Sequence, residues 1–225
     1  MVKKLIIASF LLVGSANAGM FDSVVSAVGG GGSSSSSISG SDVKGVISSF
    51  QDAEKSLFIS VDLVNKALAD KQEVAKLEEL QKTVSSMPDG AEKDAKTKEI
   101  QSSSVALAEK TVKSEKASKD AQKLSTAQKQ KVAVSTFNIL LALLKDKEAL
   151  SKAQNLVSSI SSNPTSAVQF AGDLPKLKDI VSTVPNQIDS LTTLGSGLMK
   201  LAKTAKISVA QPASASESMK PVAAF

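Results

Sequence analysis

The chain has 225 residues and a formal net charge of +5, and it contains no Cys, His, Trp or Tyr. It contains no Arg either, so all 27 basic residues are Lys. These missing types supply most catalytic bases, soft metal ligands, forked phosphate-binding groups and aromatic stacking surfaces, which argues against an enzyme, a metalloprotein and a nucleic-acid reader.

Residues 1–18 have the pattern of a secretory signal peptide. Lysines at positions 3 and 4 give a positively charged start, residues 5–13 form a short apolar run, and Ala-Asn-Ala at 16–18 is a cleavage motif. The apolar run is well short of the roughly 20 residues that a membrane-spanning helix needs. No Cys follows the cleavage motif, which argues against a lipoprotein anchor. We therefore expect an exported mature chain that begins at Gly19 and is periplasmic or extracellular.

Residues 19–40 predict a short apolar segment followed by a linker. Residues 29–37 are four Gly and five Ser, a composition typical of flexible linkers. The folded domain is therefore expected over residues 41–207.

An apolar stripe predicts one long helix from Asp42 to Met87. Between Val43 and Leu68, apolar residues recur at steps of three and four with polar residues between them, as in a coiled coil. The stripe weakens after Val74 and is stopped by the Pro-Asp-Gly turn at 88–90. A single helix of this span would be about 70 Å long.

A second helix is expected to start with Asp89 as its N-cap and Glu92 three residues later, which is a variant of the capping box. The turn before it predicts an antiparallel hairpin, with the charged residues 89–98 at a solvated tip. The stretch 109–131 is polar almost all round, and its sequence leaves open whether the helix continues through it.

The most apolar run of the mature chain is residues 132–144, and its 13 residues suit a buried core helix. Two interpretations remain open: a core segment packed on the C-terminal helices, or an apolar segment that contacts a membrane. The lack of Trp and Tyr weakens the membrane interpretation. The candidate contact residues in this run are Phe137, Ile139, Leu140, Leu141, Leu143 and Leu144.

The C-terminal part is expected to form short helices. Asn163 and Pro164 predict a helix start, and Gly172 and Pro185 predict breaks. A last helix is expected over 186–207, with lysines at its end that complement the helix dipole and could attract anionic lipid. Its candidate partner or membrane contacts are Leu191, Leu194, Leu198, Leu201, Lys200, Lys203 and Lys206. Residues 208–225 have the composition of a disordered tail.

Isolated motifs carry little weight in this chain. Ser41 and Lys44 match the S-x-x-K pattern of a Ser–Lys nucleophile, but the companion S-D-N and K-T-G patterns are absent. The acidic residues Glu78, Glu79, Asp89 and Asp94 lack the spacing of a calcium loop, so we interpret them as surface charges.

The sequence therefore predicts an all-α protein, an elongated antiparallel helical hairpin or bundle. We expect no enzymatic activity, no cofactor, no metal, no nucleic-acid partner and no small-molecule substrate. The favoured function is an exported scaffold or interaction protein of the bacterial envelope or extracellular space, which binds a protein partner or itself. The alternative is a membrane-active, pore-forming-like or lipid-binding protein that uses residues 132–144 on an anionic lipid surface.

Overall fold

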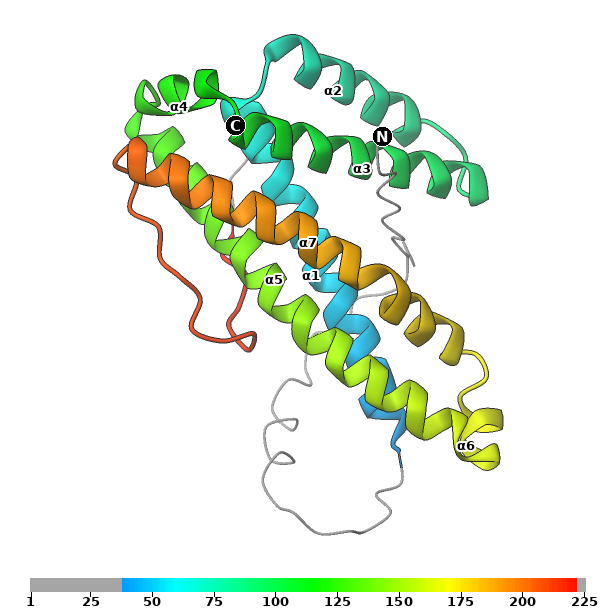
Figure 1. Cartoon of the computed structure of the whole chain (residues 1–225). Helices are drawn as coiled ribbons and strands as arrows, with labels where there is room; N and C mark the ends of the chain where they lie inside the picture. The colour runs from blue at the N-terminus through cyan, green and yellow to red at the C-terminus, as the bar shows by residue number, and fades with distance from the viewer. Residues whose placement is uncertain (1–37, 222–225) are drawn as a thin grey trace.

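The computed structural model describes residues 38–221 and is all-helical, as the sequence predicts (Figure 1). Within this range there is no strand. The predicted signal peptide and most of the predicted linker lie outside the described residues. The helices are α1 (Gly40–Leu68), α2 (Lys71–Ser85), α3 (Ala91–Val112), α4 (Glu115–Gln122), α5 (Thr126–Ser161), α6 (Pro164–Gln169) and α7 (Leu174–Thr204).

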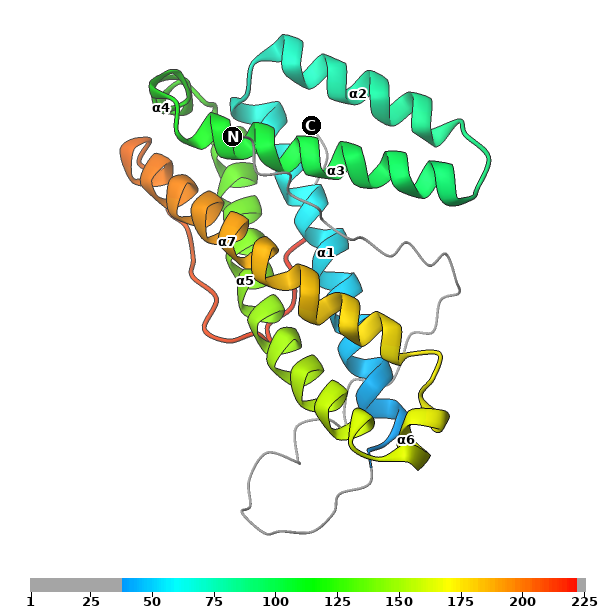
Figure 2. The ribbon, with the colours of Figure 1, turned by 45° about the vertical axis from the view of Figure 1, so that its right-hand side comes forward.

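Three long helices, α1, α5 and α7, lie side by side, with α5 antiparallel to the other two (Figure 1). The short helix α6 joins α5 to α7 at one end, which we call the α6 end. At the opposite end, the α4 end, α4 leads into α5 and α7 finishes. The α2–α3 hairpin projects sideways near the α4 end, and Figure 2 shows it from a second direction.

The core consists of two hydrophobic clusters along α1, α5 and α7. The cluster at the α4 end includes Leu57, Ile139 and Leu194, and α3 and α4 add to it through small and β-branched residues. The cluster at the α6 end includes Phe50 and Leu177. The apolar part of α5 packs on α7, as the core interpretation of residues 132–144 expects.

The predicted single helix over 42–87 is wrong, because α1 ends at Leu68 and a separate helix, α2, begins at Lys71. The Asp70 side chain accepts a hydrogen bond from the backbone N–H of Gln72 at 3.0 Å, which caps α2. The Asp70 carboxylate also pairs with Lys116 at 3.2 Å. The apolar stripe of 42–87 is therefore shared by two helices, α1 and α2, which point in different directions.

The second predicted helix is divided into α3, α4 and α5. The side chains of Ser114 and Ser125 cap α4 and α5 by accepting hydrogen bonds from backbone N–H groups three residues on. Asp89 is not the cap of α3: Gly90 takes that position at φ 155°, and Asp89 instead pairs with Lys93 at 2.8 Å. The chain through 109–131 is therefore not one continuous helix.

The start of α6 is as predicted, with Asn163 capping the backbone N–H groups of Thr165 and Ser166 and Pro164 in the first turn. The break predicted at Pro185 is wrong, because α7 runs on through it. Pro185 is exposed. Its ring therefore occupies the solvent side of the helix, and the missing backbone N–H is the main change it makes there.

Residues 205–221, which we call the C-terminal strap, leave α7 and run along α5 without helix, with a turn at 214–217 (Figure 2). Residues 208–221, where the sequence predicts a disordered tail, contain no helix and contact α5, and residues 222–225 lie outside the described range. The Asn138 amide donates to the carbonyl oxygen of Lys220 at 2.9 Å, and the Lys220 backbone N–H donates back to Asn138 Oδ1 at 2.8 Å. Lys145 Nζ donates to the Ala215 carbonyl at 2.7 Å.

Candidate interaction surface

The apolar candidate residues on α5 lie mainly inside the bundle. Phe137 is 2 % exposed, and Ile139 and Leu141 are fully buried. Leu140, Leu143 and Leu144 are half-buried. The structure therefore places the 132–144 segment in the core, and contact with a membrane through it would require the three long helices to separate.

The candidate residues on α7 divide into two faces. Four leucines of this helix point inward and are at most 3 % exposed: Leu191, Leu194, Leu198 and Leu201. Lys200, Lys203 and Lys206 are exposed. Helical spacing places Lys200 and Lys203 on the same outer side of α7, because residues three apart share a face. Lys206 follows just after the last turn of the helix.

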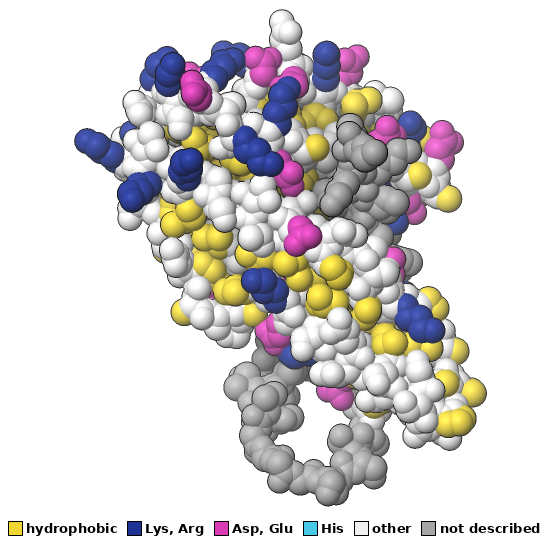
Figure 3. Space-filling view, viewed as in Figure 1, with side chains coloured by type: hydrophobic (Ala, Val, Ile, Leu, Met, Phe, Trp, Pro, Cys, Tyr) yellow, Lys and Arg dark blue, Asp and Glu magenta, His cyan; other side chains and the backbone are white. Residues whose placement is uncertain are grey.

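The exposed lysines of α7 belong to a larger basic surface at the α4 end (Figure 3). Residues 113–131 and 200–206 contain nine lysines and only two acidic residues, Glu115 and Asp120, for a formal charge of +7. All other described residues together carry 16 lysines and 19 acidic residues, or −3. We call this surface the lysine-rich end; its lysines are Lys113, Lys116, Lys119, Lys123, Lys129, Lys131, Lys200, Lys203 and Lys206.

Helix α4 presents part of this charge because its other face is anchored in the core. Ala117 and Ala121 are at most 1 % exposed and pack in the cluster at the α4 end. Lys116, Lys119 and Lys123 are exposed. The small alanines bring α4 close to the bundle and leave the long side chains to point into solvent.

The end of α7 is shaped by a reversal of the chain at Lys206. This residue has φ 55°, in the left-handed region. The backbone N–H of Ile207 donates to the carbonyl of Ala202 at 2.8 Å, and that of Lys206 donates to Lys203 at 3.3 Å. These two bonds form a Schellman motif. The reversal lets Ile207 pack against the cluster at the α4 end.

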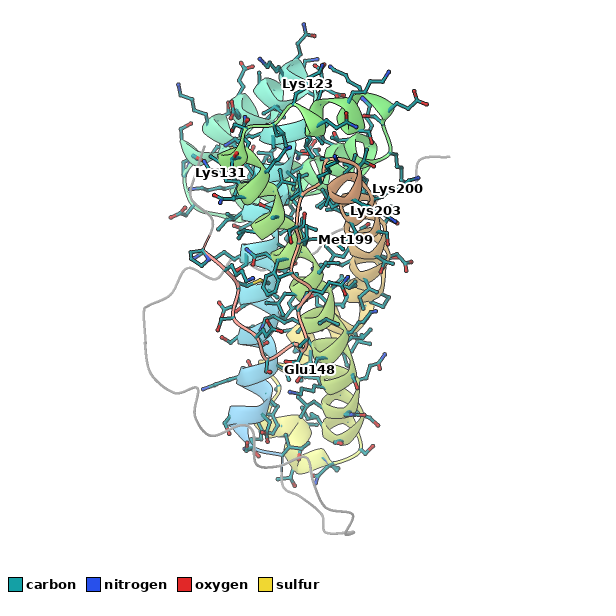
Figure 4. The ribbon with its side chains drawn as sticks, turned by 90° about the vertical axis from the view of Figure 1, so that its left-hand side faces the viewer. Lys123, Lys131, Glu148, Met199, Lys200 and Lys203 are labelled. Carbon is teal, nitrogen blue, oxygen red and sulfur yellow. The ribbon has the colours of Figure 1, made fainter. Side chains whose placement is uncertain are left out.

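A shallow groove of about 590 Å³ lies where the strap leaves α7. It is lined by Met199, Lys200, Ala202, Lys203, Ile207 and Val209. Figure 4 shows Met199, Lys200 and Lys203 at this end of α7, with Lys123 and Lys131 at the same end of the molecule and Glu148 nearer the α6 end. The groove thus combines exposed ammonium groups with apolar side chains.

Few acidic groups neutralise the lysine-rich end. Lys116 pairs with Asp70 at 3.2 Å, and Lys123 pairs with Asp120 at 3.6 Å. Over residues 38–221, no carboxylate lies within 4 Å of Lys200, Lys203 or Lys206. These three ammonium groups therefore remain available to an anionic partner.

A buried carboxyl group separates the two core clusters. Asp146 on α5 is fully buried, and the Gln187 amide on α7 donates to its Oδ2 at 2.9 Å. Its Oδ1 accepts no hydrogen bond within the described residues. Burial raises the pKa of Asp146 to about 7, against the opposing effect of the hydrogen bond from Gln187. No cationic group compensates this carboxylate in the described structure.

Other chemistries gain no support from the geometry. Ser41 lies in the exposed first turn of α1, where its Oγ is 2.6 Å from Ser39 Oγ. Residues 38–221 contain no group of three or more acidic side chains placed to hold a metal ion. In the same range, no helix combines the length and apolar character required to cross a membrane.

No protein-family model matches this chain, and no curated protein or solved structure is significantly similar to it.

Sequence reasoning found only part of this surface. It identified the lysines of α7, but it treated 109–131 as a polar stretch without noting that its lysines outnumber its acids. That imbalance is visible in the sequence. The contribution of Ile207 and Val209 is not, because it depends on the chain reversal at Lys206.

Proposed function

We propose that this chain is an exported, non-enzymatic interaction protein of the bacterial envelope or extracellular space, and that it binds an anionic partner through the lysine-rich end. The observation that carries this proposal is the concentration of nine lysines within 113–131 and 200–206, in a molecule whose other described residues are slightly acidic. A surface of one sign attracts partners of the opposite sign.

The scaffold part of the proposal draws support from the arrangement of α1, α5 and α7. Their clusters run from the α6 end to the α4 end, so the bundle holds the lysine-rich end at one extremity. The signal pattern of residues 1–18 supports export. Burial of Phe137, Ile139 and Leu141 makes direct membrane insertion through 132–144 the less favoured function.

The proposal predicts that affinity for a soluble polyanion depends on the three lysines of α7. The triple variant Lys200→Gln/Lys203→Gln/Lys206→Gln should bind heparin about 3- to 150-fold more weakly than the wild type, because each exposed ion pair contributes about 0.2–1 kcal/mol. Isothermal titration at low salt measures this, with circular dichroism to confirm that both proteins are folded.

The matched control is Lys71→Gln/Lys76→Gln/Lys82→Gln, which removes the same charge from exposed positions on α2. Its affinity for heparin should stay within about twofold of the wild type, since these sites lie outside the lysine-rich end. Equal weakening in both triple variants would show that net charge alone governs binding and would overturn the proposal.

A further inference from the structure

The groove beside Lys200 and Lys203 differs from the rest of the lysine-rich end in being amphiphilic. Met199, Ile207 and Val209 line it and are half-buried, and each therefore keeps some apolar surface in contact with water. Lys200 and Lys203 stand beside them with no carboxylate within 4 Å over residues 38–221. A partner that fits this groove must offer anionic groups and apolar surface side by side.

We infer that the groove is a docking site for the surface of an anionic phospholipid bilayer. This inference rests on the proposed function and gives its anionic partner a chemical class. Phosphate headgroups would lie against Lys200 and Lys203, and the outer methylene groups of the acyl chains would contact Met199 and Val209. The contact is interfacial and leaves α1, α5 and α7 packed as they are.

The residue types at this end favour a lipid surface over other polyanions. Lys is a compact point charge without the rigid fork that lets Arg bind a phosphate in fixed geometry. A bilayer does not require a fixed binding geometry, because its headgroups diffuse and can gather around each ammonium group. Lys also keeps its charge in the headgroup layer while its methylene stem contacts apolar material. A polysaccharide or nucleic acid would leave the apolar lining of the groove unused.

Charge spread over three elements suits an extended, flat partner. The lysines come from α4 and its two flanks, the start of α5 and the end of α7, and they gather at one end of the molecule (Figures 3 and 4). Each lysine near an anionic membrane contributes about 1 kcal/mol, or about fivefold in the partition coefficient. The attraction falls off within a Debye length, so it depends on salt.

Cosedimentation with vesicles of phosphatidylcholine and phosphatidylglycerol in a two-to-one ratio tests the inference. Lys200→Gln/Lys203→Gln should lower the partition coefficient about 25-fold, or fivefold for each lysine. Met199→Gln/Val209→Gln should lower it severalfold and leave heparin affinity unchanged, because these residues meet only the apolar part of the partner. Vesicles of phosphatidylcholine alone should bind neither variant nor the wild type.

A site-specific probe gives a second readout that leaves Lys200 and Lys203 in place. The chain has no Cys, so Met199→Cys can carry a single environment-sensitive fluorophore. Its emission should shift to the blue on the anionic vesicles. The same label at Leu80→Cys, an exposed position on α2, should show no shift.

The outcomes separate the two proposals. Heparin binding that depends on the α7 lysines, without vesicle binding, would overturn the lipid inference and keep the proposed function with a different polyanion. An unshifted label at position 199 on vesicles that do bind the protein would also overturn the inference. A wild-type protein that bound neither heparin nor the anionic vesicles would overturn both proposals.

Discussion

Replacing Asp146 with Asn is expected to stabilise the protein by about 2–4 kcal/mol above pH 7 and to remove most of its pH dependence between about pH 4 and pH 7. In the folded protein the pKa of Asp146 is about 7, against 3.8 for an aspartate side chain in water. Over this interval the folded state holds a proton that the unfolded state releases. The free energy of unfolding of the wild type therefore falls as pH rises, by up to about 1.4 kcal/mol per pH unit.

Urea unfolding monitored by circular dichroism at several pH values measures this effect. The matched control is Asp52→Asn, the same chemical change at an exposed position on α1, which should follow the wild-type pH profile. The difference between the wild type and Asp146→Asn cancels the contributions of the other carboxyl groups. If both proteins lost stability in parallel between pH 4 and pH 7, Asp146 would not be a buried, uncompensated carboxyl group.

Replacing Gly197 with Ala is expected to destabilise the protein by about 1–3 kcal/mol, although Ala is the better helix former. A Cβ at position 197 would lie 2.5 Å from Cγ2 and 2.8 Å from Cβ of Val112 on α3. Gly197 therefore allows α3 to approach α7 closely. Replacing Gly195 should cost less, because a Cβ there meets the flexible end of Leu140 at 2.9 Å.

Gly45→Ala is the matched control for this prediction. Gly45 lies inside α1, is exposed, and has no atom within 4 Å of an added Cβ. The change should raise the free energy of unfolding by roughly 0.5–1 kcal/mol, since Ala loses less conformational freedom than Gly on folding. Adding Val112→Ala to Gly197→Ala should recover part of the loss. Thermal unfolding that ranked Gly197→Ala above the wild type would contradict the close approach of α3 and α7.

The helical class and several helix boundaries follow from local sequence. The stripe from Val43 to Leu68 buries one face of α1, and Asn163 and Pro164 start α6 as predicted. The break at Asp70 is harder to predict, because apolar residues continue on both sides and a single cap decides it. At Pro185 the sequence predicts a break that the structure does not have, since an exposed proline can lie within a helix that is stabilised by tertiary packing.

Other features of the structure were not predicted because they depend on contacts between residues far apart in the sequence. The strap has the composition of a disordered segment, yet Asn138 binds the backbone of a residue 82 positions away. From sequence alone, Asp146 looks like an ordinary surface acid of a charged helix. Only the structure shows that it is buried between the two hydrophobic clusters. The α7 lysines were identified from sequence, but the groove beside them depends on the reversal at Lys206.

The most direct test of the central claim, that the lysine-rich end is the binding surface, is an amide chemical-shift titration of the mature protein with heparin. The account predicts that the largest shifts fall within residues 113–131 and 199–209, and that they decline as salt is raised. Shifts concentrated on the α2–α3 hairpin or at the α6 end would contradict it.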